Sequence, residues 1–226
     1  MGPAQERLKV HRRSVRLDGR AYTVLSPRPS VSSKFATRRD GATCQILTDA
    51  VGAQLLARLC WAMAYQRHER TVTVIDSHFL FSNPFDADTS SPIVIVNSAL
   101  GSLSGAALAD LHSQLPLATP SNGTVVLQTR GLDQALGDPA AFGQRADQVA
   151  RRSESHKERW IDGDSGLWVL TAPPPVLRAW GVELSGPDGK GVGEGEVQVL
   201  RGFDDQVARS IAPPNHPLPG QAPTAR

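Results

Sequence analysis

The segment 92–130, PIVIVNSALGSLSGAALADLHSQLPLATPSNGTVVLQTR, decides the fold class. It begins with an almost uninterrupted apolar run at 92–97, which is typical of a strand buried on both faces. Leucines then recur at helical spacing over 102–115, and TVVLQTR at 124–130 has the composition of a further strand. Strand, helix and strand in this order predict a βαβ unit with parallel strands and a right-handed crossover.

The segments before this unit add a second type of strand pairing. TVTVID at 71–76 is β-branched and predicts a strand, which is separated from 92–97 only by the short loop 82–91. A parallel crossover needs a longer connection, so these two strands are predicted to be antiparallel neighbours or not adjacent. The sheet is therefore expected to be mixed.

Two further elements are expected near the N-terminus. Alternating residues on both sides of Asp18-Gly19 predict a β-hairpin, because this dipeptide accepts the positive φ angles of a tight turn. Apolar residues repeat every four positions over 43–68, which predicts one long helix capped by Thr43, and the loop 26–42 joins the two. Both cysteines, Cys44 and Cys60, fall within this helix, about 24 Å apart and too far for a disulfide.

These elements predict an α/β fold: a mixed β-sheet with a βαβ unit, packed by three to four helices, and an N-terminal β-hairpin. Residues 1–212 are expected to form a single domain, with 1–42 as a basic hairpin and loop at its start. Residues 213–226 contain five prolines and no apolar pattern, so a disordered Pro-rich tail is expected there.

Charge is unevenly distributed along a chain whose net charge is only +2. Residues 1–40 contain ten Lys and Arg against three Asp and Glu, whereas the remaining residues carry a net negative charge. No apolar run approaches the length of a membrane span, and no apolar segment follows the N-terminal charges as in a secretory signal. A cytoplasmic location without membrane contact is therefore expected.

The basic N-terminal arm is the first candidate for function. Arg12, Arg13 and Arg16 lie close together in the predicted hairpin and are expected to contact a polyanion, either nucleic acid or an anionic protein partner. This hypothesis describes a binding or assembly module in which the sheet is a scaffold.

The second candidate is the turn at 97–105, which leaves a buried strand and opens a helix. Backbone N–H groups and the helix dipole favour an anion at such a turn, and strand ends of α/β sheets are common ligand sites. If the strands are parallel, Arg130 ends the neighbouring strand on the same side. Asn97, Ser98, Ser102 and Arg130 are therefore predicted to bind a phosphate- or carboxylate-bearing metabolite, which would make the protein an enzyme or a sensor.

A third cluster is formed by Asp76, His78, Asp86 and Asp88, whose side chains are of metal-binding types. The preferred interpretation is that Asp76 ends its strand and that the loop acids form solvated turns. The sequence contains no signature of a catalytic nucleophile or of a phosphate-binding loop. Neither a metal nor a cofactor is predicted, and the reaction, if any, stays open.

Overall fold

The computed structural model describes residues 7–31, 33–40, 43–82, 88–117, 121–138, 141–142, 165–185, 198–201 and 209–211. The strands are β1 (Arg7–Leu17), β2 (Arg20–Ser26), β3 (Phe35–Asp40), β4 (Thr43–Thr48), β5 (Thr71–Ile75), β6 (Ile93–Asn97), β7 (Gly123–Gln128), β8 (Trp168–Ala172), β9 (Gln198–Arg201) and β10 (Arg209–Ile211). The α-helices are α1 (Ala50–Ala64), α2 (Gly105–Ser113), α3 (Leu132–Gly137) and α5 (Pro174–Ser185), and the 3-10 turns are η1 (Ser77–Phe79) and η2 (Ser98–Leu100).

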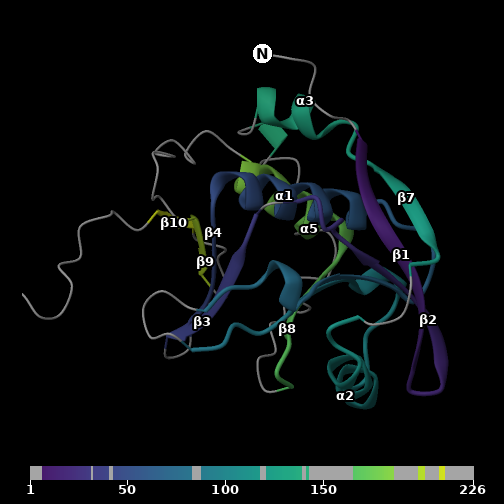
Figure 1. The fold of residues 1–226 in the computed structure, drawn as a ribbon. Coiled ribbons are helices and arrows are strands. Elements are labelled where there is room, and N and C mark those ends of the chain that lie inside the picture. Colours follow the sequence, from purple (N-terminus) through teal and green to yellow (C-terminus); the bar gives the residue numbers. More distant parts are fainter. Residues whose placement is uncertain are drawn as a thin grey trace, which may run out of the picture.

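A six-stranded mixed sheet organises the fold, in the order β7-β1-β2-β5-β6-β8 (Figure 1). The pairs β2/β5 and β6/β8 are parallel, and the other three pairs are antiparallel. The predicted fold class, a mixed α/β sheet with an N-terminal hairpin, is confirmed. Of the two arrangements predicted for β5 and β6, antiparallel neighbours or strands that are not adjacent, the structure has the antiparallel pair.

The βαβ unit does not lie at 92–130, so its predicted location was wrong. Strand β7 pairs antiparallel with β1 at the far edge of the sheet, four strands away from β6. The parallel crossover instead joins β2 to β5 and contains α1, and a second one joins β6 to β8 and contains α2. Alternation within β7 is compatible with either partner, so the local pattern could not decide between them.

The hairpin β1–β2 turns where the sequence predicts it. Asp18 has φ 47° and Gly19 has φ 70°, two successive positive values that identify a type I′ turn. The register then pairs Leu17 with Arg20 and continues without interruption to His11 opposite Ser26. Each residue of β1 can therefore be assigned to one face of the sheet.

The helix predicted at 43–68 begins later than expected. Residues 43–48 form β4, which pairs with β3 and β9 in a smaller four-stranded sheet, so Cys44 lies in a strand and not in the helix. Asp49 is the N-cap of α1 and accepts a hydrogen bond from the Gly52 amide at 2.6 Å. The polar loop predicted at 26–42 likewise contains β3, which pairs antiparallel with β4 from Phe35 opposite Thr48 to Asp40 opposite Thr43.

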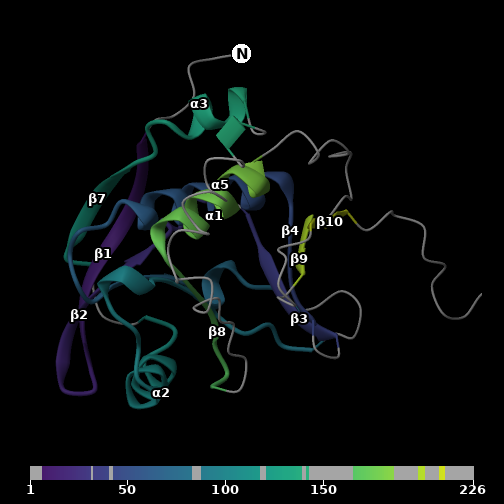
Figure 2. The ribbon, with the colours of Figure 1, turned by 180° about the vertical axis from the view of Figure 1, so that it is seen from behind.

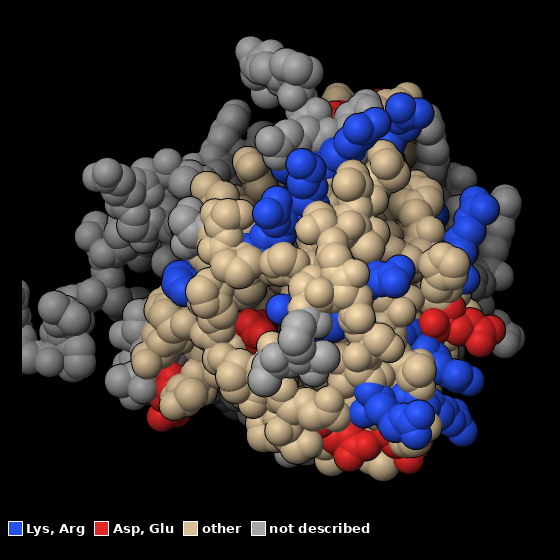
Figure 3. Space-filling view, turned by 45° about the vertical axis from the view of Figure 1, so that its right-hand side comes forward, with Lys and Arg blue, Asp and Glu red and all other residues tan. Residues whose placement is uncertain are grey.

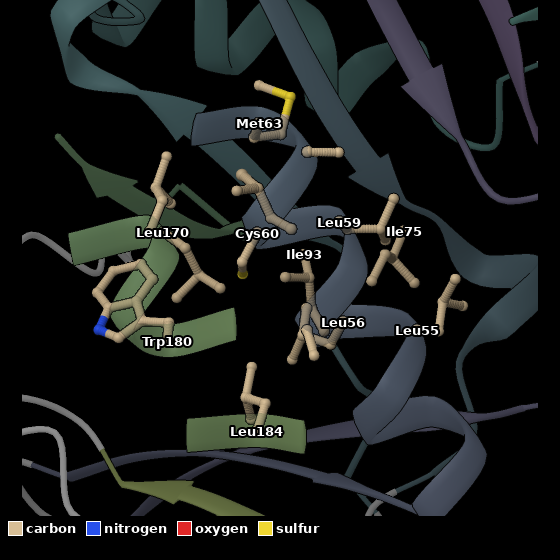
Figure 4. Packing of buried hydrophobic residues seen from close by; sticks show 14 of the residues in the cluster. Leu55, Leu56, Leu59, Cys60, Met63, Ile75, Ile93, Leu170, Trp180 and Leu184 are labelled. Atoms are coloured by element: carbon tan, nitrogen blue, oxygen red, sulfur yellow. The ribbon is translucent and has the colours of Figure 1, made fainter. Parts of the chain in front are cut away.

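Two hydrophobic cores lie on opposite faces of the large sheet. Helices α1 and α5 pack against each other on one face, here called the α1 face, where Leu59, Met63 and Trp180 meet Ile93 and Leu170 (Figure 4). Helix α2 covers part of the other face, here called the α2 face, at the end of the sheet that carries the β1–β2 turn (Figures 1 and 2). Gly181 permits the close approach of α5, since a Cβ there would lie 3.0 Å from the Ala57 carbonyl oxygen.

Strand β1 contributes to both cores. Val10 is buried on the α1 face, whereas Val15 and Leu17 are buried on the α2 face under α2. Because side chains alternate along a strand, the odd-numbered residues of the first half of β1 point to the α2 face, beyond the part that α2 covers. That half of β1 presents its odd-numbered side chains on a part of the sheet that no helix of the described residues covers.

The C-terminal half of the chain is described only in part. Strand β8 ends directly before Pro173, and α5 follows from Pro174 to Ser185. Asp138, which follows α3, accepts a hydrogen bond through Oδ1 from the Ala141 amide at 3.0 Å. The apolar stripe at 143–160, the glycine-rich stretch 186–197 and the tail 213–226 lie outside the described residues, and the single-domain extent 1–212 stays a prediction. No helix in the described ranges is long and apolar enough to span a membrane.

Candidate functional site

Asn97, the first residue of the predicted anion site, serves the architecture of the fold. Its side chain is only 2% exposed and donates a hydrogen bond through Nδ2 to the carbonyl oxygen of Met63 at 3.0 Å. Its Oδ1 accepts a hydrogen bond from the Ala99 amide at 3.1 Å. Asn97 therefore connects the last turn of α1, where carbonyl groups lack helical partners, to the start of η2.

The two serines of the predicted site have different environments. The Ser98 hydroxyl is buried and has no hydrogen-bond partner. Ser102 is exposed and lines a small hollow together with Tyr22 and Arg70. The serines and Asn97 are thus close in the chain, but only Ser102 presents its side chain to solvent.

Arg130 lies at the opposite end of the sheet from Ser102, so the four residues do not converge. It follows β7, whose Gln128 pairs with Arg7, whereas the end of β6 is level with Ser14 on β1. Seven residues of β1 separate these levels, about 23 Å along the strand. The carbonyl oxygen of Arg130 accepts a hydrogen bond from Trp61 Nε1 at 3.2 Å. The expected convergence with Arg130 depended on β6 and β7 being parallel neighbours, whereas β7 pairs antiparallel with β1.

The N-terminus of α2 already has a negative partner within the protein. Ser104 caps the helix by accepting a hydrogen bond from the Ala107 amide at 3.1 Å, and its hydroxyl donates to Asp18 Oδ2 at 3.0 Å. Asp110 in turn accepts a hydrogen bond from the Asp18 amide at 2.7 Å. The tip of the β1–β2 hairpin is thereby fastened to α2, and the Asp18 carboxylate complements the helix dipole.

In the acidic cluster, the best-defined residue is Asp76, whose role is structural. Asp76 is buried, and its two carboxylate oxygens accept hydrogen bonds from the amides of His78 at 3.3 Å and Leu117 at 3.4 Å. His78 and Asp88 are exposed, while Asp86 lies outside the described residues. Within the described ranges, no three His, Cys, Asp or Glu side chains are arranged to hold a metal ion. Asp76 ends β5 and caps η1, in agreement with the preferred interpretation.

The arginines of the N-terminal arm are divided between the two faces of the sheet. The register places Arg12 and Arg16 on the α1 face and Arg13 on the α2 face. Arg13 donates a hydrogen bond to the Ser26 hydroxyl at 2.6 Å. The three arginines expected to act together therefore do not form one surface.

A different set of basic residues shares one surface. Arg7, Lys9, His11 and Arg13 are the odd-numbered residues of the first half of β1, and neighbouring side chains on one face of a strand are about 6.8 Å apart. Arg28, which follows β2, is near enough to His11 for its charge to act on the imidazole. These five side chains are called the basic row below. The space-filling view of this side of the molecule shows Lys and Arg side chains running across it in a line (Figure 3).

His11 lies within the electrostatic influence of two other members of the basic row. The pKa of His11 is lowered by burial first, and then by the positive charges of Arg13 and Arg28. The lowered pKa favours the neutral form of the His11 imidazole. Buried nitrogens of the row, His11 Nδ1 and Arg28 Nε, have no hydrogen-bond partner.

Three of the four cations in the row have no carboxylate partner in the part of the chain that the structure describes. Arg7, Lys9 and Arg28 form no ion pair there. The adjacent strand β7 contributes Thr124, Val126 and Gln128 to the same face, none of them charged. The site is thus a positively charged strip beside a neutral edge strand.

No protein-family model, no curated protein and no solved structure matches this chain. The basic row combines like charges with unsatisfied buried nitrogens, a combination that stabilises no fold by itself.

The sequence contained part of the signal for this row. Applying strict alternation to the predicted strand separates Arg12 and Arg16 from Arg13, and groups Arg13 with Arg7, Lys9 and His11. The contribution of Arg28 could not be found in this way, because its approach to His11 depends on the loop that leaves β2.

Proposed function

We propose that this protein binds nucleic acid through the phosphate backbone, using the basic row on the α2 face of β1. The observation that carries the proposal is the row itself: four permanent cations and one imidazole on a part of the sheet that no described helix covers. Evenly spaced cations along an extended strand suit a ligand with evenly spaced negative charges. Phosphate contacts of this kind give affinity that depends little on base sequence.

The surroundings of the row favour nucleic acid over an acidic protein. Protein interfaces depend on a buried apolar centre, commonly with aromatic anchors. Among the described residues, the large exposed apolar side chains are Val51, Tyr65, Phe81 and Val126. Only Val126 lies on the face of the row, where it neighbours Lys9 across the β1–β7 pair. The row therefore offers charge and hydrogen bonding with almost no apolar anchor.

Salt dependence provides the test. We expect a labelled, mixed-sequence, single-stranded oligonucleotide of about 16 nucleotides to bind, as measured by fluorescence anisotropy at several salt concentrations. If all four cations contact phosphate, the slope of log K against log salt should be about −2.8, so affinity should fall about 50-fold between 50 and 200 mM salt. Binding that is indifferent to salt would contradict a phosphate-based interface.

Matched variants locate the interface on the protein. Substituting Arg7, Lys9 and Arg28 by Gln should reduce the slope to about −0.7, because one permanent cation remains. Arg13 is left intact in this variant, since it also donates a hydrogen bond to Ser26. The control replaces three exposed arginines outside the row with Gln. These are Arg12, Arg16 and Arg67.

The row variant and the control lose the same number of positive charges, so a difference between their affinities reflects where those charges lie on the protein. Affinity should fall strongly in the row variant and little in the control. Equal losses would show that only overall charge matters and would overturn the assignment to the row. Binding of poly-glutamate as tight as that of the oligonucleotide would replace nucleic acid by an acidic protein partner.

A further inference from the structure

A small hollow lies at the end of the sheet opposite the start of β1, between the first residues of β5 and the turn that follows η2. Tyr22, Thr71 and Asn97 contribute buried walls, while Arg70, Gly101 and Ser102 complete its rim. The space open to the centre of a water molecule is about 30 Å³, enough for about two waters. The hollow can therefore admit one small polar group but not a whole metabolite.

Arg70 at the rim combines two unusual properties. Its φ is 55°, in the left-handed region that residues with a side chain rarely adopt. This conformation is held by the parallel pairing that starts at Thr71 and by a hydrogen bond from the Thr23 amide to the Arg70 carbonyl oxygen at 2.9 Å. Its guanidinium is exposed and forms no ion pair with any described carboxylate. An arginine is thus kept at a strained position where glycine would be less costly.

Further hydrogen-bond donors belong to the turn on the other side of the hollow. The backbone N–H groups of Ser102 and Leu103 have no acceptor among the described residues, and Ser102 adds its hydroxyl. Gly101 has φ 120°, which only glycine adopts readily and which sets the course of this turn. Asn97 fixes the turn at one end and Ser104 at the other, so the donors are held on a rigid support.

We infer that this hollow binds a single oxyanion group, the phosphate of a small phosphorylated molecule, with Arg70 as its cation and the 102–103 turn as its donor surface. The N-terminus of α2 takes no part, because Ser104 and Asp18 already occupy it. This site shares Ser102 with the anion site predicted from the sequence, but its cation is Arg70 and not Arg130. It is separate from the basic row and does not depend on nucleic acid binding.

Titration of ¹⁵N-labelled protein with inorganic phosphate tests the inference, with chloride at equal ionic strength as the reference. The amide resonances of Gly101, Ser102 and Leu103 are expected to shift and to saturate. Shifts that spread over the basic row and grow linearly would show nonspecific ion binding and would overturn the site. Repeating the titration with acetate and with a phosphate monoester distinguishes the phosphate group from carboxylates and from free phosphate.

Three variants decide the role of Arg70. Arg70→Gln should abolish saturation, and Arg130→Gln should leave it unchanged, because Arg130 lies at the other end of the sheet. Arg70→Gly should also abolish saturation while raising the melting temperature, since it removes the strain at φ 55°. Retained saturation in either Arg70 variant would overturn the inference.

The experiment is independent of the proposed function. Phosphate saturation lost with Arg70 but unaffected by the triple substitution at Arg7, Lys9 and Arg28 supports the hollow whatever the oligonucleotide measurements show. Phosphate binding that disappears with the row substitutions instead would assign the anion to the row and refute the hollow.

Discussion

Two substitutions of Asn97 should both destabilise the protein: the loss of stability should depend on pH for Asn97→Asp and should not for Asn97→Ala. Asn97 makes two hydrogen bonds from a nearly fully buried position, one as donor to Met63 and one as acceptor from Ala99. Each such bond contributes about 0.5–1.5 kcal/mol. Asn97→Ala removes both, so the free energy of unfolding should fall by about 1–3 kcal/mol. For a chain of this length, 2 kcal/mol corresponds to a melting temperature lower by about 4–8 °C.

The isosteric substitution Asn97→Asp separates the two hydrogen bonds. A carboxylate can still accept from the Ala99 amide, but it faces the Met63 carbonyl oxygen without a proton to donate. Burial and this repulsion raise the folded-state pKa of the new carboxyl above its unfolded value of about 3.9. Its charged form is disfavoured in the folded state, so the destabilisation is present above the folded-state pKa and absent below the unfolded one.

Urea unfolding at about pH 8 and about pH 5 measures this difference. At about pH 8, Asn97→Asp should be less stable than Asn97→Ala, because an unpaired buried charge costs more than a missing side chain. Towards acid pH the new carboxyl gains a proton that it can donate to Met63, so its stability relative to wild type should recover. The alanine variant should show the same deficit at both pH values. A carboxylate variant as stable as wild type at about pH 8 would refute the proposed connection between α1 and η2.

Two further predictions concern the core formed by α1 and α5. Gly181→Val should lower the free energy of unfolding by about 1–3 kcal/mol in urea unfolding, because a Cβ at this position would lie only 3.0 Å from the Ala57 carbonyl oxygen. The control Gly105→Ala should change the free energy of unfolding by less than about 1 kcal/mol, because no atom lies within 4 Å of the added Cβ. Burial raises the pKa of the Cys60 thiol to about 12. In a Cys44→Ser variant, the native protein should therefore not react with Ellman's reagent at about pH 8, and rapid labelling would contradict this burial. The free energy of unfolding should decline as pH rises above about 9, because the thiol then ionises in the unfolded state but not in the folded one.

The parts of the fold predicted correctly are those in which neighbouring residues contain the information. Asp18-Gly19 determines its turn by backbone preference alone, and the apolar run at 92–97 identifies a strand covered on both faces. The short loop after β5 similarly excludes a parallel pairing with β6, and the structure has the antiparallel one. These predictions needed no knowledge of distant contacts.

The errors arose where two interpretations have the same local pattern. Leu47 continues the four-residue repeat of α1, yet its segment pairs with β3 and β9 as a strand. Valines and leucine in β7 alternate equally well beside β6 or β1, and the choice of β1 moves Arg130 to the other end of the sheet. The role of Arg70 was not visible either, because its positive φ follows from the parallel pairing of β5 with β2.

The strand order also has a consequence for synthesis on the ribosome. The four central strands β1, β2, β5 and β6 are all complete by Asn97, together with α1, whereas both edge strands and α5 come later. Between Asn97 and Ser185, the end of α5, the nascent chain exposes the surface of α1 that α5 will cover. At about 5–20 residues per second, this interval lasts about 4–18 s. Both edges of the incomplete sheet are unpaired until β7 is made, and the β6 edge stays unpaired until β8 follows. Unpaired strand edges and the uncovered apolar surface of α1 are features that chaperones bind and that promote aggregation when protection is absent.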